Sequence, residues 1–161
     1  MEILFFQNWE IFIRLVLAVI FGGLIGIERQ IAHKTAGLRT FSLISLSSCL
    51  LAVVSILLEK SFPDFNVAII PTSIIGGIGF IGAGLIIFHG SQPSGVTTAA
   101  GLLVAAAVGM ATGFGFYSIA IFTVIITLMI FTIFWIISTN LSKSRFGSLS
   151  KTIFPSISLA R

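Results

Sequence analysis

The stretch FYSIAIFTVIITLMIFTIFWII (Phe116–Ile137) contains no charged residue. A helix needs about 20 mostly apolar residues to cross the hydrocarbon core of a bilayer, so this stretch predicts a membrane span. Four further apolar runs precede it, at Ile11–Ile27, Phe41–Leu58, Val67–Phe88 and Thr97–Thr112. Because their apolar residues are continuous rather than alternating, they do not fit the strands of a membrane barrel. The sequence therefore predicts an all-α, polytopic transmembrane bundle of five spans.

The composition agrees with a membrane protein. Hydrophobic residues make up 57% of the chain, charged residues make up 9%, and the mean hydropathy is +1.15. Soluble domains have about 25% charged residues. We assign residues 1–140 to one bundle and residues 141–161 to a basic cytoplasmic tail. No Lys or Arg precedes the first run and no small-residue cleavage site follows it, so we interpret it as an uncleaved helix.

Basic residues are distributed unevenly between the two ends of the predicted helices. One end, formed by the first joint and the tail, holds Arg29, Lys34, Arg39, Lys143, Arg145, Lys151 and Arg161, whereas the joints at the other end hold Lys60. Basic residues close to helix ends stay in the cytoplasm. With five spans, this pattern predicts an N-terminus outside and a C-terminus in the cytoplasm. The net charge of +4 then reflects orientation in the membrane, and no nucleic-acid partner is expected.

Small residues recur every three or four positions in three of the runs, for example at Gly22 and Gly26, at Gly79 and Ala83, and at Gly101. Helices in lipid associate through close backbone approach, which small residues permit. We therefore predict that the first, third and fourth helices form the centre, with the second beside them and the fifth facing lipid. The candidates for helix packing or for lining a pore are Gly22, Gly26, Gly77, Gly79, Gly82, Gly84, Thr97, Thr98 and Gly101.

The run GGIGFIGAG (Gly76–Gly84) leaves two alternatives open. Each glycine weakens a helix by about 1 kcal/mol relative to alanine. Either unusually close packing compensates for this loss, or the helix is locally unwound, which is tolerated only where protein or water surrounds the backbone. Pro71, a few residues earlier, predicts either the first turn of this helix or a kink in it.

A few charged residues are candidates for function. Arg14 lies inside the first apolar run, where a charge suggests a functional site. Alternatively, Arg14 reaches the outer headgroups or pairs with Glu10 one turn earlier. At the opposite end of that helix, Glu28 and Arg29 precede Arg39 of the second helix, and we predict a functional cluster of these three residues.

Neither a metal site nor an active site is predicted. Glu28 is the only acidic residue at the predicted cytoplasmic end, and one carboxylate is a weak site for Mg²⁺. The histidines, His33 and His89, have no other acidic partner there. No metalloprotease motif, phosphate-binding loop or nucleophile elbow occurs in the sequence. We therefore expect a protein without a metal or cofactor that is not an enzyme.

Four segments resemble the MgtC/SapB family: RLVLAVIFGGLIGIERQ (Arg14–Gln30), KTAGLRT (Lys34–Thr40), GIGFIGAG (Gly77–Gly84) and GVTTAAGLLVAAAVG (Gly95–Gly109). The resemblance covers roughly residues 11–137. The family's motif positions then fall on Arg14, Gly22, Gly26, Glu28, Arg29, Gly37, Arg39, Thr40, Gly77, Gly79, Gly82, Gly84, Thr97 and Thr98. Ser94 departs from the pattern, since many members have a basic residue there. The founding member carries a soluble C-terminal domain after the membrane part, whereas this sequence stops at Arg161, so we expect the short, membrane-only form of the family.

The resemblance implies a bacterial inner-membrane protein associated with growth in low magnesium, acid tolerance and survival in macrophages. It further implies a regulator that binds another membrane protein, and one proposed partner in the family is the membrane ATP synthase. Two alternatives stay open: a small oligomeric transporter or channel for Mg²⁺ or another ion, and a structural oligomeric module. We expect a homo-oligomer in the bilayer in each case. The scarcity of charge favours the regulator, because transport would need oxygen ligands.

Overall fold

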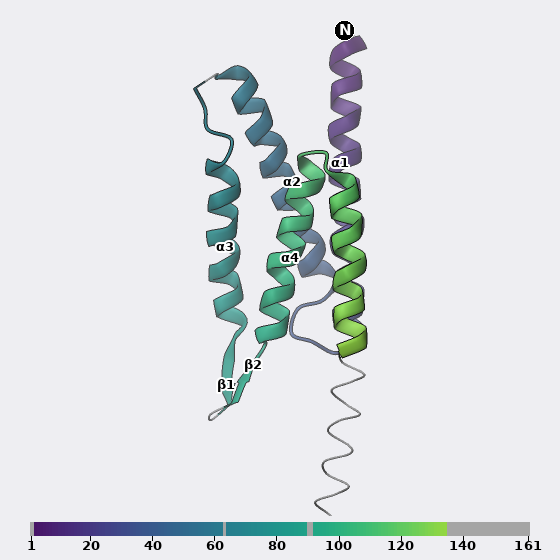
Figure 1. Ribbon diagram of the computed structural model, residues 1–161, viewed down its shortest axis with the longest axis vertical. Coiled ribbons are helices and arrows are strands. Elements are labelled where there is room, and N and C mark those ends of the chain that lie inside the picture. The colour runs from purple at the N-terminus through teal and green to yellow at the C-terminus, as the bar shows by residue number, and fades with distance from the viewer. Residues whose placement is uncertain (1, 63, 90–91, 135–161) are drawn as a thin grey trace, which may run out of the picture. The chain divides into compact units, whose positions relative to one another are not determined.

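The computed structural model describes residues 2–62, 64–89 and 92–134 (Figure 1). Its elements are α1 (Glu2–Ile31), α2 (Leu38–Ser61), α3 (Ile69–Leu85), β1 (Ile87–His89), β2 (Gln92–Ser94) and α4 (Val96–Gly113), followed by a helix over Tyr117–Phe134. Four of these described helices are long and apolar enough to span a membrane, and α3 is a shorter apolar helix of 17 residues. The predicted class, a polytopic helical membrane protein, is confirmed. The orientation of the termini stays a prediction.

The chain divides into two compact units, Met1–Thr127 and Leu128–Arg161. The packing described here is that of the first unit. The predicted tail at residues 141–161 lies outside the described residues.

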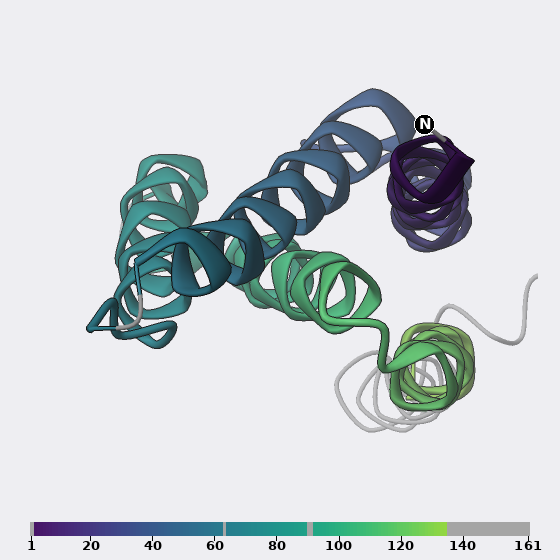
Figure 2. The same cartoon turned by 90° about the horizontal axis from the view of Figure 1, so that it is seen from above.

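Helix α2 lies at the centre of the first unit. It packs extensively against both α1 and α4, which also contact each other, whereas α3 packs mainly on α4 and only marginally on α2 (Figure 2). The prediction that the first, third and fourth helices form the centre is therefore wrong. The second helix takes the place that was predicted for the third.

The glycines of α1 and α4 explain this central place. A methyl group added at Gly22 would lie 2.6 Å from Ser45 Cβ, and one added at Gly113 would lie 2.7 Å from Ala52 Cβ. Ser45 and Ala52 are fully buried small residues of α2. The glycine stripes of α1 and α4 thus serve close backbone approach, as predicted, but their common partner is α2.

Helix α3 continues without a break through Gly76–Gly84, so the unwound alternative is wrong. Pro71 lies in its first turn, where the missing amide hydrogen breaks no helical hydrogen bond. The helix buries Ile74, Ile78 and Gly82. A methyl group added at Gly82 would lie 3.4 Å from Ala99 Cβ of α4.

The other glycines of α3 do not pack tightly. Methyl groups added at Gly76, Gly77, Gly79 and Gly84 would meet no atom within 4 Å. The close packing predicted for the face around Gly79 and Ala83 is therefore absent from the described part of the chain.

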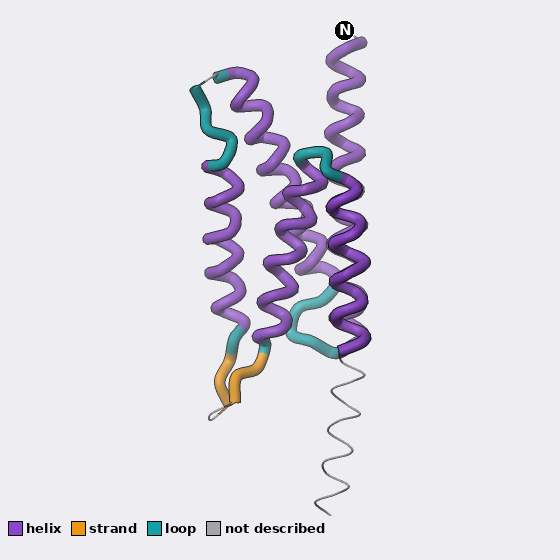
Figure 3. The backbone as a smooth tube through the Cα atoms, viewed as in Figure 1, coloured by secondary structure: helices purple, strands orange, loops and turns teal. Residues whose placement is uncertain are grey.

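The connection from α3 to α4 is a short two-stranded hairpin, shown in orange in Figure 3, in which Ile87 pairs with Ser94 and His89 with Gln92. Gly95 ends the hairpin with a φ of +87°, a conformation that glycine adopts without strain. Its α-carbon also approaches the Leu85 carbonyl oxygen too closely for a side chain.

Candidate functional site

Arg14 connects α1 to the end of α4. Its Nη1 donates a hydrogen bond of 2.6 Å to the carbonyl oxygen of Gly113, and its Nη2 pairs with Glu10 Oε1 at 2.6 Å. The carbonyl groups at a helix C-terminus carry partial negative charge, so a cation is favourable there. Of the alternatives left open for Arg14, the structure shows the pairing with Glu10, and the contact with α4 adds a role in joining the two helices.

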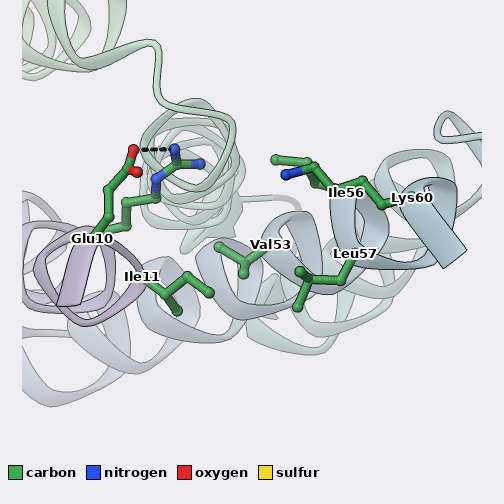
Figure 4. A pocket seen from close by; sticks show the side chains of 7 residues that line it. Glu10, Ile11, Val53, Ile56, Leu57 and Lys60 are labelled. Carbon is green, nitrogen blue, oxygen red and sulfur yellow. Dashed lines mark hydrogen bonds and ion pairs between the residues drawn. The ribbon is translucent and has the colours of Figure 1, made fainter. Parts of the chain in front are cut away.

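A cavity of about 70 Å³ lies beside this pair (Figure 4). It is lined by Glu10, Ile11 and Arg14 of α1 and by Val53, Ile56, Leu57 and Lys60 of α2. Figure 4 shows the Lys60 side chain extending toward the Glu10–Arg14 pair, which the dashed line marks. We call this the Arg14 cavity. Its position was not predicted, although the pairing of Arg14 with Glu10 was one of the alternatives for Arg14.

The predicted cluster of Glu28, Arg29 and Arg39 lies at the opposite end of α1. Arg29 Nε donates a hydrogen bond to Glu28 Oε2, and only 3% of the Arg29 side chain is exposed, compared with 21% for Glu28. Arg39, in the first turn of α2, is exposed, and the described residues contain no ion pair to it. The structure therefore brings together two of the three predicted members.

Arg14 and Arg29 are 15 positions apart on one helix, which corresponds to about 22 Å at a rise of about 1.5 Å per residue. The charged candidates thus form two separate groups, one near each end of the bundle.

The predicted packing positions differ in their surroundings. Gly22 and Gly26 of α1 contact α2, and Gly82 contacts α4. Thr98 and Gly101 are buried on α4, whereas Thr97 is exposed. The remaining candidates, Gly77, Gly79 and Gly84, have open space beside them.

An open groove of about 430 Å³ lies between α2 and α3, and the sequence did not predict it. Ser47, Ser48, Ser73 and Gly77 contribute to its lining. Ser47 and Ser73 donate hydrogen bonds to carbonyl oxygens of their own helices, at 2.9 Å from Ser47 to Leu43 and 2.9 Å from Ser73 to Ile69. Within residues 2–62, 64–89 and 92–134, no group of three or more His, Cys, Asp or Glu side chains could hold a metal ion.

Comparison with known proteins finds a matching family model and several similar proteins. The sequence model of the MgtC family matches residues 15–139. Over 133 residues the chain is 41% identical to the "putative magnesium transporter YhiD" of Escherichia coli K12, covering 78% of this chain and 60% of the relative. It is 41% identical to protein SapB of Bacillus subtilis over 114 residues, 67% of this chain and 49% of SapB. It is 43% identical to protein MgtC of Brucella abortus over 101 residues, 63% of this chain and 41% of that protein.

The chain thus spans between 41% and 60% of the length of these three relatives. No solved structure matches it significantly.

Proposed function

Because the chain belongs to the MgtC family, we propose that it is a bacterial inner-membrane protein that regulates another membrane protein by binding it. No catalytic step is part of the proposal. The long apolar helices and the family support a polytopic membrane protein. The binding function is supported by one structural observation, the open glycine face of α3.

This face consists of Thr72, Gly76, Gly79 and Ala83, and we call it the α3 glycine face. At about 100° per residue, it lies about 130° around the helix from the buried Ile78. Gly76 and Gly79 have open space beside them, whereas the glycines at corresponding places in α1 and α4 contact α2. The small residues of α1 and α4 are therefore used within the first unit, and those of the α3 glycine face are not.

An unused glycine face is unfavourable for a lone helix. Glycine lowers helix stability by about 1 kcal/mol relative to alanine. Contact with lipid tails does not compensate for this loss, because lipid makes no specific packing contacts with an exposed glycine. A second transmembrane helix could approach the backbone there closely and so compensate for this loss. The exposed Phe80 beside the face, 81% of whose surface is accessible, would add an apolar contact.

The family resemblance makes the membrane sector of the ATP synthase the first partner to test. A photo-crosslinking amino acid at Phe80 should give an adduct with one of its membrane subunits, identified by mass spectrometry. The same amino acid at the exposed Phe122, on the helix Tyr117–Phe134, should not give this adduct.

Gly79→Leu should abolish the Phe80 adduct while the protein still folds, because Gly79 is exposed and an added Cβ meets no atom within 4 Å. Identical adducts from Phe80 and Phe122, or an undiminished adduct in Gly79→Leu, would contradict binding through the α3 glycine face. An adduct between two copies of the chain would identify a second copy, rather than the ATP synthase, as the partner that binds this face.

Transport of Mg²⁺ is the second candidate function. One relative, at 41% identity, carries the name of a putative magnesium transporter. The serine hydroxyls along the groove between α2 and α3 are oxygen atoms that could contact a cation. Purified protein in liposomes distinguishes the two candidates. Mg²⁺ flux above that of protein-free liposomes would favour the transporter, and its absence would favour the regulator.

A further inference from the structure

The Arg14 cavity carries an excess of positive charge. Three charged side chains line it, and Glu10 is engaged by Arg14. Lys60 makes no hydrogen bond or ion pair within the described part of the chain, although it lies close enough for electrostatic attraction to Glu10. Because the Glu10–Arg14 pair is neutral as a whole, one positive charge remains uncompensated in the cavity.

The cavity also has free hydrogen-bond donors. Arg14 Nε is buried and has no hydrogen-bond partner, whereas both terminal nitrogens of the same guanidinium are occupied. A buried donor without a partner is unfavourable. The Lys60 ammonium group can donate three further hydrogen bonds. An anion with several oxygen atoms in the cavity could accept these hydrogen bonds from Lys60.

The size and the walls of the cavity limit the kind of anion. A volume of about 70 Å³ exceeds the ~10–15 Å³ needed for one water molecule, so a larger group such as a phosphate fits. The remaining walls are the apolar side chains Ile11, Val53, Ile56 and Leu57. A free phosphate ion would be poorly matched by these walls, whereas the glycerol and acyl chains attached to a lipid phosphate would contact them favourably.

The location of the cavity fits a lipid as well. It lies between two helices long enough to cross a membrane, close to the last turn of α2. Basic side chains near membrane ends attract anionic lipid headgroups. We propose that the Arg14 cavity binds the phosphodiester group of an anionic phospholipid, with Lys60 as its main cationic contact and the acyl chains lying along α1 and α2.

The test uses the full chain purified in detergent and freed of lipid. Native mass spectrometry and thermal unfolding are measured with phosphatidylglycerol, with phosphatidylcholine and with inorganic phosphate. Phosphatidylglycerol should bind several-fold more tightly than phosphatidylcholine and should raise the unfolding temperature more. Inorganic phosphate should have little effect.

Variants of the two titratable side chains at the rim test the assignment. Lys60→Gln should remove the preference for phosphatidylglycerol, and Lys60→Arg should keep it, because the positive charge is retained. Glu10→Gln should strengthen the preference, since it removes the competing negative charge. The matched control is Lys34→Gln, an exposed lysine in the loop at the opposite end of α1, which should leave the preference unchanged.

Each contrary outcome has a definite meaning. An undiminished preference in Lys60→Gln, or equal binding of the two lipids to the unmodified chain, would overturn the proposal. Equal stabilisation by inorganic phosphate would overturn the lipid assignment and leave a free-anion site. Because Lys60 is exposed, its substitution should not prevent folding, and circular dichroism provides the check.

Discussion

The α-carbon of Gly109 lies against the main-chain carbonyl of Ser45, too close for any side chain to fit between them. Ser45 also faces Gly22 on its other side, where an added methyl group would come within 2.6 Å of its Cβ. One small residue of α2 thus lies between glycines of α1 and α4. This arrangement brings the backbones of α1 and α4 into close contact with that of α2, which allows the van der Waals packing that drives helix association in lipid.

Substitutions at these glycines should separate the helices. Gly109→Ala should destabilise the protein by about 1–3 kcal/mol, the usual range for overpacking a well-packed core. Gly76→Ala is the matched control in α3, because the added methyl group meets open space there and alanine favours a helix. The measurement is reversible unfolding in mixed detergent micelles. Equal stability of the two variants would mean that α4 does not pack on α2 in this way.

Removal of the Arg14 guanidinium should weaken the contact between α1 and α4. Arg14→Gln loses the charged hydrogen bond to the carbonyl oxygen of Gly113, and a hydrogen bond to a charged group contributes about 1.5–3 kcal/mol. It also loses the solvent-exposed pair with Glu10, which adds little to stability. Arg39→Gln serves as the control, since Arg39 is exposed and surface substitutions change stability by about 0.5 kcal/mol or less. The same unfolding measurement compares the two. Similar effects of both substitutions would contradict the joining role of Arg14.

A disulfide should link α3 to α4 at one defined place. An added Cβ at Gly82 would lie 3.4 Å from Ala99 Cβ, close to the ~3.5–4.5 Å separation found in disulfides. Gly82→Cys with Ala99→Cys, in a background with Cys49→Ala, should therefore cross-link upon mild oxidation. Gly79→Cys with Ala99→Cys should not, because Gly79 has no neighbour within 4 Å. Non-reducing electrophoresis after cleavage between the two helices detects the link.

The helices themselves were predictable, because each is a continuous apolar run bounded by polar residues or glycine. The Glu10–Arg14 pair was also predictable, since residues four apart share a helix face. The contact between Arg14 and Gly113 was not, because it joins positions 99 residues apart and involves a backbone carbonyl, which carries no signal in the sequence.

The central helix was misidentified for a physical reason. A stripe of small residues shows that a helix can be approached closely, but it does not show which helix approaches. The glycine run of α3 gave the densest such signal, yet most of it faces open space. Ser45, Cys49 and Ala52 of α2 are slightly larger than glycine and form a weaker pattern in the sequence, although they contact the glycines of α1 and α4.

The orientation in the membrane can be tested by labelling single cysteines. The positive residues near the loop between α1 and α2 predict that this loop faces the cytoplasm. Thr35→Cys should therefore be protected from a membrane-impermeant thiol reagent in intact cells, and Ser61→Cys should react. Both positions are exposed, and the native Cys49 is buried, so it should contribute little background. Reaction of Thr35→Cys from outside would reverse the predicted orientation.

Substitution of Glu28 tests whether the charged group at the end of α1 is functional. Glu28 pairs with Arg29, and only 3% of the Arg29 side chain is exposed. Glu28→Gln keeps the size of the side chain but removes its charge, which leaves the buried cation less well compensated. The free energy of unfolding should fall by about 1–3 kcal/mol. The decrease stays in this range because Glu28 is partly exposed, so water can take over part of its interaction with Arg29. Insertion should be unchanged, because the apolar residues by which α1 crosses the membrane stay the same.

The measurement is growth in limiting magnesium, the condition that the family resemblance suggests. A strain lacking the native protein is complemented with the unmodified chain, with Glu28→Gln or with Glu59→Gln, at matched protein levels. Glu59 is an exposed acid in the last turns of α2, so its substitution makes the same chemical change without disturbing a buried cation. We expect reduced growth only with Glu28→Gln. Full complementation by Glu28→Gln would show that the pair with Arg29 merely stabilises the end of α1, and the functional hypothesis for this cluster would then be rejected.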